Sequence, residues 1–341
     1  MTGRAVSFAV VGCGNIGSRH LGVLTATPRA RIAGLCDIDP ERCRKYSALY
    51  EGVPSFTSFE ELLRKLPADV ISICTPHHLH APMAIEAARA GRHLLVEKPM
   101  SLTAADARAM SAAADAAGVR LMVVKQNRYN VPVALTKRAL DEGRLGRIHM
   151  VQCRVLWNRH EGYYSESPWR GRKALEGGAL FTQVSHFLDL LIWWFGDVER
   201  ASAQLARRKH RIEIEDCGAA QVVFSSGVIG SLDWTTCVYG RNYEGSITII
   251  GDRGTVKIGG QYLNKIEYWD VEDYQLPPDT QFTDKPNAYG KYQGTSSNHD
   301  RVIQDAVSDI LGGTSNSVSG SDGLKVVEAI ECIYRHAEWR T

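Results

Sequence analysis

The residues best suited to chemistry begin with Glu97-Lys98-Pro99, which follows the apolar segment Leu94-Leu95-Val96. If that segment is a strand of a parallel sheet, the lysine lies at the carboxyl end of the strand, where open α/β sheets bind ligands. A lysine in such a place can have a lowered pKa and can hydrogen-bond a substrate hydroxyl. The motif alone also fits a solvated lysine at a strand end.

A second candidate is His186, within the strongly apolar segment Ala179–Phe195. Thr182, His186 and Asp189 recur at positions i, i+4 and i+7, so they share one face of a helix. Asp189 or Thr182 could orient the imidazole and leave its other nitrogen to act as an acid or base. The pattern equally allows a core histidine whose hydrogen bonds are satisfied by Asp189.

A third motif is the glycine pattern Gly12-Cys13-Gly14-Asn15-Ile16-Gly17, directly after the strand-like Phe8-Ala9-Val10-Val11. Such a turn between a strand and a helix lets the backbone approach a pyrophosphate, whose charge then faces the helix N-terminus. The spacing alone is weak, but Asp37 follows Gly17 at the offset of an acid that binds the ribose diol. These features together predict a dinucleotide site.

Asp37 also predicts which dinucleotide binds. A carboxylate accepts a hydrogen bond from the ribose 2′-hydroxyl and repels a 2′-phosphate. Ile38 and Asp39 follow it, with no arginine beside it in the sequence to hold that phosphate. The sequence therefore predicts NAD rather than NADP as the cofactor.

The first third of the chain alternates strands and helices, and its strands are apolar on both faces. This pattern predicts an α/β Rossmann domain with a parallel, doubly wound sheet. The expected strands are Ser7–Val11, Arg31–Cys36, Val70–Cys74, His93–Val96 and Arg120–Val124, and the expected helices are Ile16–Thr25, Pro40–Tyr50, Phe59–Leu66, Pro82–Ala90 and Ala104–Ala117.

After Val124 the pattern changes to longer, alternating strands, which predict an α+β domain with a large, mostly antiparallel open sheet. We therefore expect a Rossmann domain over 1–126 and a substrate-binding and oligomerisation domain over 127–341. The expected strands are Ile148–Trp157, Arg200–Ala206, Gly218–Phe224, Val228–Trp234, Gly245–Ile250 and Thr255–Ile258, and the expected helices are Val131–Glu142, Ala179–Phe195, Asn298–Leu311 and Asp322–Glu338.

The composition excludes several classes of protein. A net charge of +2 gives no reason to expect a nucleic-acid or membrane partner. The eight cysteines form no C-x-x-C pair, so we expect neither a disulfide framework nor a metal site, and a reducing cytoplasm is the natural compartment. No signal peptide and no membrane-spanning stretch are visible.

The motifs together resemble the Gfo/Idh/MocA family, which includes glucose–fructose oxidoreductase and inositol dehydrogenase. The resemblance covers essentially the whole chain and rests on Gly12–Gly17, Thr75-Pro76 with His80, Glu97-Lys98-Pro99, Asn127-Arg128-Tyr129 and the Gly177–Asp189 segment. It implies that Lys98 and His186 are the catalytic pair. It also implies the following cofactor-binding residues: Gly12, Gly14, Asn15, Ile16, Gly17, Asp37, Thr75, Pro76, His80, Glu97, Lys98, Gln126, Asn127, Trp169 and Arg170.

One position departs from the family pattern. Many members have an aspartate four residues before the histidine, where this chain has Thr182. The resemblance therefore does not imply a proton relay assisted by an aspartate at that position.

A narrower resemblance concerns the substrate. The segments Lys125–Asn130, Trp169–Gly171 and Tyr243–Gly260 resemble the UDP-N-acetyl-glucosaminuronate 3-dehydrogenases of bacterial surface-polysaccharide synthesis. Such a substrate needs cations for its diphosphate and carboxylate, although each arginine taken singly fits a solvated surface residue better. The implied substrate-binding residues are Lys98, Arg128, Tyr129, Arg159, Arg172, Thr182, His186 and Arg241.

The sequence thus predicts an NAD-dependent dehydrogenase that oxidises a sugar ring hydroxyl to a ketone, with C3′ of a UDP-linked N-acetylated uronic acid as the first choice. A dehydrogenase of inositol or another free sugar or polyol is the main alternative. A catalytically inactive regulator that senses NAD or sugar is a second alternative, against which intact Lys98 and His186 argue. Because family members commonly associate through the C-terminal sheet, we expect a homo-oligomer, a tetramer or dimer.

Overall fold

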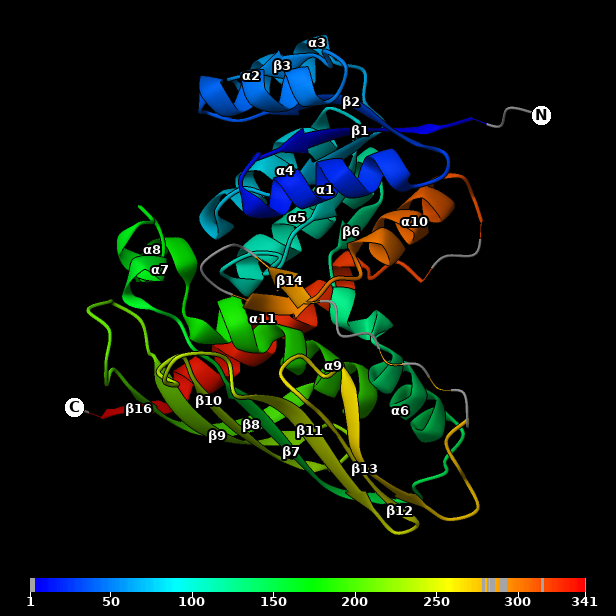
Figure 1. The fold of residues 1–341 in the computed structure, drawn as a ribbon, viewed down its shortest axis with the longest axis vertical. Coiled ribbons are helices and arrows are strands. Elements are labelled where there is room, and N and C mark those ends of the chain that lie inside the picture. The colour runs from blue at the N-terminus through cyan, green and yellow to red at the C-terminus, as the bar shows by residue number, and fades with distance from the viewer. Residues whose placement is uncertain are drawn as a thin grey trace. The chain divides into compact units, whose positions relative to one another are not determined.

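The computed structural model describes residues 4–277, 280, 282, 286–288, 293–313 and 316–340. Contacts divide the chain into two compact units, each of which is described by itself (Figure 1). The first unit contains Met1–Lys125 and His299–Val327, and the second contains Gln126–Asn298 and Glu328–Thr341.

The first unit is built on a six-stranded parallel sheet with the strand order β3-β2-β1-β4-β5-β6. Every residue of β1 and β4 is buried, as expected for central strands covered on both faces. The sequence predicted all of these strands except the two-residue β3. They are β1 (Val6–Val11), β2 (Ala30–Cys36), β3 (Ser55–Phe56), β4 (Val70–Ile73), β5 (His93–Val96) and β6 (Leu121–Val123).

The strand order reverses between β1 and β4. Crossovers leave these two strands in opposite directions, so right-handed connections place α1 and α4 on opposite faces of the sheet. Such a reversal opens a crevice at the carboxyl ends of the two strands, where dinucleotides bind. The helices are α1 (Asn15–Ala26), α2 (Pro40–Leu49), α3 (Phe59–Lys65), α4 (His80–Arg89) and α5 (Ala104–Ala117), with a 3-10 turn η1 (His77–Leu79) before α4.

The chain returns to the first unit near its end. Helix α10 (His299–Ile310) contacts α1, and the first part of α11 (Gly320–Arg335) is also assigned to this unit. The division expected from sequence placed everything after residue 126 in the second domain. A pattern of local elements could not reveal this return, because it depends on contacts between segments far apart in the chain.

The second unit contains an eight-stranded sheet in the order β13-β12-β11-β7-β10-β9-β8-β16. Only the pairs β7–β10 and β8–β16 are parallel, so the sheet is mostly antiparallel, as predicted. Its strands are β7 (Ile148–Leu156), β8 (Val198–Ala206), β9 (Cys217–Phe224), β10 (Ile229–Thr235), β11 (Glu244–Gly251), β12 (Gly254–Gly259), β13 (Lys265–Val271) and β16 (Ala337–Arg340), and β14 (Pro286–Ala288) pairs separately with β15 (Gln293–Ser296).

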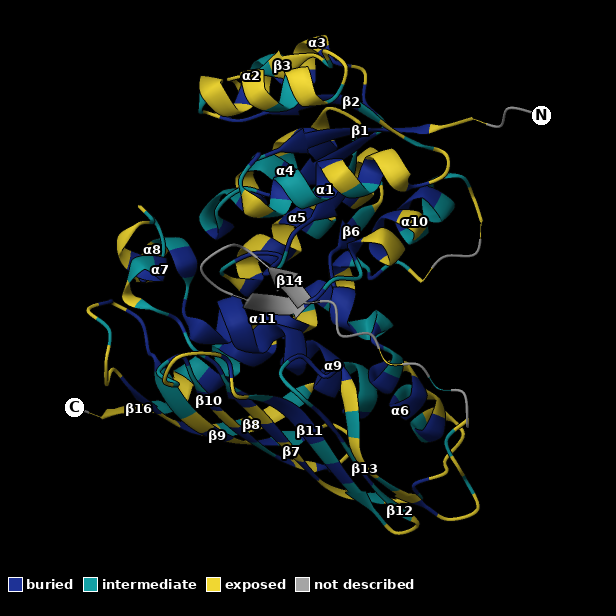
Figure 2. Cartoon of the chain, viewed as in Figure 1, coloured by how far each residue is buried: buried dark blue, intermediate teal, exposed yellow. Residues whose placement is uncertain are grey.

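Burial alternates along β7, where Val151, Cys153 and Val155 are buried and the residues between them are exposed (Figure 2). One face of the sheet therefore packs inward while the other faces outward. The sequence missed β13 and β16. In particular, the helix expected to end at Glu338 ends at Arg335, and the following residues pair with β8 as β16.

The helices of this unit are η2 (Gln126–Tyr129), α6 (Val131–Asp141), α7 (Glu161–Ser165), α8 (Lys173–Glu176), the π-helical turn η3 (Leu180–Val184) and α9 (Ser185–Phe195). The single helix expected over Ala179–Phe195 thus begins with a π turn, a feature that is frequent at functional sites. Within the described part of the chain, no helix is long and apolar enough to cross a membrane.

Candidate active site

The glycine turn between β1 and α1 has the geometry that a pyrophosphate requires. Gly12 has a φ of +89°, and a Cβ there would lie 2.7 Å from the Cys74 carbonyl oxygen. A Cβ at Gly17 would overlap the Gly12 carbonyl, whereas one at Gly14 would meet nothing within 4 Å. Gly12 and Gly17 are therefore needed for packing, and Gly14 leaves its side of the loop open to a ligand. Helix α1 starts directly after Gly14 with no side-chain cap, so its first N–H groups suit an anion.

Asp37 closes this site at the end of β2. Its carboxylate accepts hydrogen bonds from the backbone N–H groups of Cys13 (2.7 Å) and Asp39 (2.9 Å), which orient it beside the glycine turn. Arg42 on α2 lies 3.6 Å from the same carboxylate. The sequence showed no neighbouring arginine, so this is a correction: the helical turn after Asp39 brings one close in space. The open glycine turn, the uncapped start of α1 and the oriented Asp37 carboxylate fit NAD.

His80 connects the Thr75-Pro76 turn to the segment after Lys98. Its ring nitrogens lie 2.8 Å from the Pro99 and Thr75 carbonyl oxygens, and burial lowers the pKa of the imidazole. A neutral imidazole has one N–H, so it donates to one of these carbonyls at a time. The sequence predicted His80 as a cofactor contact. Because the side chain is fully buried, its observed contacts are instead those of a support between two loops.

Glu97, expected to border the cofactor, is also buried. Its Oε1 lies 3.0 Å from Nε2 of His20 on α1 and 3.5 Å from Nε2 of His299 on α10. Its Oε2 accepts the backbone N–H of Lys98 at 3.2 Å. Burial disfavours the carboxylate, but its contacts with the histidines, above all the hydrogen bond from His20, hold the pKa of Glu97 well below its usual range.

The two histidines differ in charge. Burial disfavours the His20 imidazolium, but Cys74 and Glu97 raise the pKa of His20 to about 10. Burial prevails at His299 and lowers its pKa despite Glu97. At neutral pH the cluster therefore contains an imidazolium, a carboxylate and a neutral imidazole. Nδ1 of His20 is held by the Ser72 hydroxyl at 2.8 Å.

The second candidate group, His186, follows the π turn in α9 and is buried. The sequence suggested that Asp189 or Thr182 orients its ring. Both are engaged with other residues: Arg128 forms a bidentate pair with Asp189 at 2.8 and 2.9 Å. Thr182 donates to Glu176 Oε1 at 3.0 Å. The catalytic role of His186 and the alternative of a core histidine both stay predictions from the sequence.

Arg128 was predicted to bind substrate, but its guanidinium pairs with Asp189 and stacks over Trp193, with its Cζ 4.9 Å from the ring centroid. The neighbouring Gln126 and Asn127 are buried, and Tyr129 completes the η2 turn. Together with α9, this turn makes a packed segment that anchors the Arg128 guanidinium through Asp189. Substrate binding by Arg128 stays a prediction.

Arg159 is buried as well. Its guanidinium lies 5.2 Å from the ring centroids of both Trp157 and Tyr163, while that of Arg170 lies 4.1 Å from the Tyr163 centroid. One tyrosine ring thus contacts two cations. Arg170 also lies 5.3 Å from the ring of Trp169, the other predicted member of that pair.

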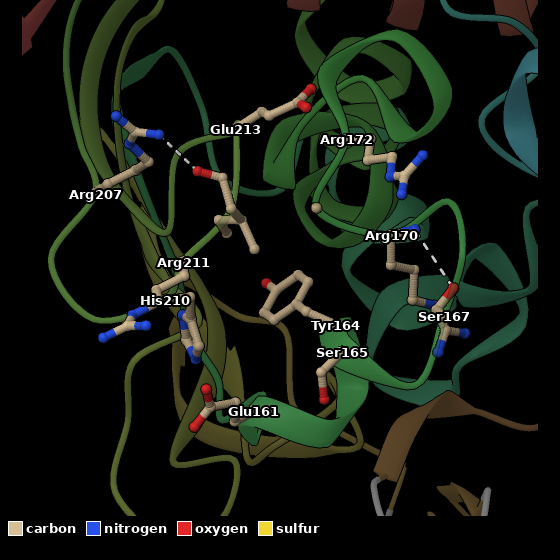
Figure 3. Close-up of a pocket in the computed structure, with 12 residues that line it drawn as sticks. Glu161, Tyr164, Ser165, Ser167, Arg170, Arg172, Arg207, His210, Arg211 and Glu213 are labelled. Carbon is tan, nitrogen blue, oxygen red and sulfur yellow. Dashed lines mark hydrogen bonds between the residues drawn. The ribbon is translucent and has the colours of Figure 1, made fainter.

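A hollow of about 680 Å³ lies in the second unit, between residues 161–172 and the loop 207–213 (Figure 3). Four arginines and one histidine line it, opposed by two glutamates: Arg170, Arg172, Arg207, Arg211 and His210, with Glu161 and Glu213. Of the predicted residues it thus brings together Arg170 and Arg172. Arg241, also predicted, is exposed and does not line it.

The loop 207–213 lines this hollow, and the residues predicted from sequence did not include it. Its five consecutive basic residues, Arg207-Arg208-Lys209-His210-Arg211, were the available signal. Asp216 holds the loop by accepting three successive backbone N–H groups and the His210 ring, and these bonds outweigh burial and lower the pKa of Asp216. Hydrogen bonds to one carboxylate therefore anchor the backbone that carries these basic side chains.

Two clusters among the described residues contain metal-ligand types: His20 with Glu97 and His299, and His210 with Asp216 and Cys237. In each, the groups already contact one another, and His20 and His210 bond to the carboxylates at 3.0 and 3.1 Å. These contacts explain both clusters as polar networks inside the protein.

Comparisons with known proteins identify both halves of the chain. Residues 6–125 match the Gfo/Idh/MocA model described as an oxidoreductase family with an NAD-binding Rossmann fold. Residues 133–257 match the model of the Gfo/Idh/MocA C-terminal domain. The first match confirms NAD as the expected cofactor class.

Two solved structures of the dehydrogenase WlbA are similar over nearly the whole chain, and both contain NADH and UDP-GlcNAcA. The protein from Bordetella pertussis is 37% identical, with a TM-score of 0.87, and the match covers 98% of this chain and 96% of that one. The protein from Chromobacterium violaceum is 36% identical, with a TM-score of 0.90 and coverage of 98% and 94%.

Curated relatives have other substrates in their names. D-Apiose dehydrogenase of Paraburkholderia graminis is 28% identical over 98% of this chain and 88% of its own length. The 1-carboxy-3-chloro-3,4-dihydroxycyclohexa-1,5-diene dehydrogenase of Comamonas testosteroni is 30% identical over 67% of this chain. That match spans 57% of the relative, less than two thirds of its length.

Proposed function

The chain belongs to the Gfo/Idh/MocA family of NAD-dependent oxidoreductases, and from this premise we propose that it oxidises C3′ of UDP-N-acetyl-glucosaminuronic acid. The observation that carries the proposal is the similarity to the two WlbA structures, which extends over 98% of the chain. The product, a keto sugar nucleotide, would serve the synthesis of bacterial surface polysaccharides.

In the proposed reaction Lys98 and His186 act on the same hydroxyl. The Lys98 ammonium binds the hydroxyl oxygen and polarises it, and a ring nitrogen of His186 takes its proton. The C–H bond breaks with its electron pair as the carbonyl forms. Bound NAD supplies the acceptor for that hydride. Thr75, Pro76, Gln126, Asn127 and Trp169 remain proposed neighbours of the cofactor.

Charge in the second unit supports an anionic substrate. A UDP-linked uronic acid carries about three negative charges, and guanidinium groups match phosphate and carboxylate geometry. The hollow lined by Arg170, Arg172, Arg207 and Arg211 offers such groups on anchored loops. A neutral polyol has no anionic group for them to bind.

The direct test is NADH formation with a panel of substrates. We expect turnover with UDP-N-acetyl-glucosaminuronic acid, much less with UDP-N-acetylglucosamine, which lacks the carboxylate, and none with inositol or glucose. UDP alone should raise the melting temperature of the NAD complex, and added salt should reduce that rise because it screens ion pairs. Oxidation of a free polyol, with no shift caused by UDP, would refute the proposal.

A free-sugar dehydrogenase is the second candidate, favoured by the full-length similarity to D-apiose dehydrogenase. D-Apiose and inositol therefore belong in the substrate panel. A regulator without activity is the third, and any catalytic turnover that requires Lys98 would exclude it.

We also propose that the chain forms a dimer or tetramer through the outward face of the eight-stranded sheet. Exposed Met150 and Ile229 lie on neighbouring strands of that sheet, at paired positions of β7 and β10. Light scattering that shows a monomer at micromolar concentration would refute this.

All eight cysteines are free thiols, which supports a reducing compartment such as the cytoplasm.

A further inference from the structure

Three side chains from distant parts of the chain meet inside the first unit: His20 from α1, Glu97 from the end of β5 and His299 from the start of α10. All three are buried, at 0%, 5% and 1% exposure. The ring centroids of the two histidines lie 5.5 Å apart, edge to face. Ligands in solution therefore do not reach the histidines, and any effect of these residues on the reaction must be indirect.

The cluster is connected to Lys98 through the carboxylate. Both histidines approach Oε1 of Glu97, which leaves Oε2 to accept the backbone N–H of Lys98. Ser72 on β4 holds the far side of the His20 ring. The Glu97 carboxylate therefore joins α1, β5 and α10 at the residue that precedes the proposed catalytic lysine.

The charges in the cluster explain why it can persist in the interior. A buried carboxylate without a partner is costly, but here an imidazolium at 3.0 Å balances it and the second imidazole adds a polar contact. The other groups that face the cluster are Cys74 and Ser72 at the end of β4, Arg19 on α1 and His80 on α4.

We infer that His20 and His299 are positioning residues for the reaction: they hold Glu97, and Glu97 fixes the backbone that carries Lys98. The inference rests on the proposed role of Lys98. It assigns a function to the return of the chain through α10, because the C-terminal segment supplies His299. A purely structural role would change stability without a selective effect on turnover.

The test compares His299→Phe, which keeps the ring volume and removes the polar nitrogens, with His299→Gln, which keeps a donor. We expect His299→Phe to lower kcat about tenfold, or about 1.4 kcal/mol, with NAD affinity within about twofold of the parent protein. His299→Gln should recover most of the loss. His93→Gln, at the opposite end of β5, is the matched control and should leave kcat unchanged.

Coupling to the lysine separates this inference from the proposed function. In a Lys98→Met background, His299→Phe should cause no further loss, because residues that act through one group are not additive. Wild-type turnover in Lys98→Met alone would overturn the proposed role of Lys98, whereas the proposed function as a whole fails if the parent protein does not oxidise the UDP-sugar acid. If Lys98→Met lowers turnover and His299→Phe lowers it further by the same factor as in the parent protein, or if His299→Phe and His299→Gln lose equally, only the inference is overturned.

Two further measurements test the role of the histidine cluster. If His299→Phe does not fold, Ser72→Ala removes only the hydroxyl that holds His20 and should lower kcat about threefold with little change in NAD affinity. An unchanged kcat in Ser72→Ala would contradict the inference.

Elemental analysis of the purified protein should find no stoichiometric transition metal. A metal ion bound to His20 and His299 would make these histidines ligands and would overturn the inference.

Discussion

Glu97 in the first unit and Glu215 in the second are both buried glutamates beside a proposed catalytic segment, yet their pKa values move in opposite directions. The pKa of Glu97 lies well below its usual range because two histidines contact it. Burial raises the pKa of Glu215 to about 7, although the Tyr334 hydroxyl donates to it at 2.7 Å and the Leu180 N–H at 3.1 Å.

The difference lies in the chemistry of the partners. An imidazole can take up a proton and become positively charged, so Glu97 forms a buried ion pair with His20. The Tyr334 hydroxyl and the Leu180 N–H donate hydrogen bonds to Glu215 but carry no positive charge, and these bonds do not overcome the cost of burying a charge there. Burial alone therefore does not determine ionisation in this protein.

The largest expected effect is on the pH dependence of stability at Glu215. Its pKa in the folded protein is above the ordinary 4.5, so the folded state binds the proton more tightly and stability falls as pH rises from about 4.5 to about 7. Glu215→Gln removes this loss. We expect the variant to exceed the parent in unfolding free energy at about pH 8, by on the order of 3 kcal/mol, in urea titrations.

Glu97→Gln should show the opposite behaviour. The pKa of Glu97 is lowered in the folded state, so its contribution to stability is present above the ordinary value and is lost as pH falls through the folded value. The variant should therefore be less stable than the parent at neutral pH, and the difference in their free energies of unfolding should disappear at acidic pH. Parallel pH profiles for the two variants would contradict the comparison.

The next largest effect is on turnover, when either proposed catalytic residue, Lys98 or His186, is replaced. Lys98→Met should lower turnover by more than about a hundredfold, or about 2.7 kcal/mol, and His186→Asn should do the same, since general acid–base groups contribute on that scale. NAD binding, followed by fluorescence titration, should survive in both. A variant with parental turnover would show that its residue is structural.

The first unit was largely predictable from sequence, and its site less so. Repeated strand–helix units and the Gly12–Gly17 turn are local patterns, and the structure has them at the expected positions. The contact between Glu97 and His299 joins segments that no local pattern relates. The sequence therefore did not reveal the contacts of Glu97 with His20 and His299, and its place beside the cofactor stays a prediction from the family resemblance.

In the second unit the errors have different causes. The bidentate pair of Arg128 with Asp189 links a 3-10 turn to a helix, and neither residue type reveals that choice of partner. The π turn at Leu180–Val184 leaves the apolar pattern of a helix unchanged, so periodicity does not detect it. The basic run 207–211, in contrast, was visible in the sequence and could have been used.

A smaller effect is expected on cofactor selectivity at Asp37. Like Glu215, this carboxylate accepts hydrogen bonds from backbone N–H groups, but it lies at the proposed cofactor site. NAD should bind at least about tenfold tighter than NADP, or about 1.4 kcal/mol, in calorimetry. Asp37→Ser should reduce the difference in affinity between NAD and NADP, because Arg42 would then be available to a 2′-phosphate. Asp37→Ser with Arg42→Ala is the matched control and should reduce that difference less. Equal affinities in the parent protein would refute the role of Asp37.

The smallest effect tests whether neutral donors stabilise a second buried carboxylate near His186. Thr182 donates to Glu176 Oε1 at 3.0 Å, and the Gly171 N–H donates to the other oxygen. Thr182→Val keeps the shape and removes the hydroxyl, so we expect a loss of about 1 kcal/mol in the free energy of unfolding. Thr182→Ser keeps the donor and should lose less. Glu176→Gln replaces the carboxylate that accepts this hydrogen bond, so adding Thr182→Val to it should cost less than in the parent protein. A double-mutant cycle in urea measures this coupling. Additive losses would mean that the hydroxyl does not stabilise the carboxylate, and the comparison with Glu215 would then not extend to Glu176.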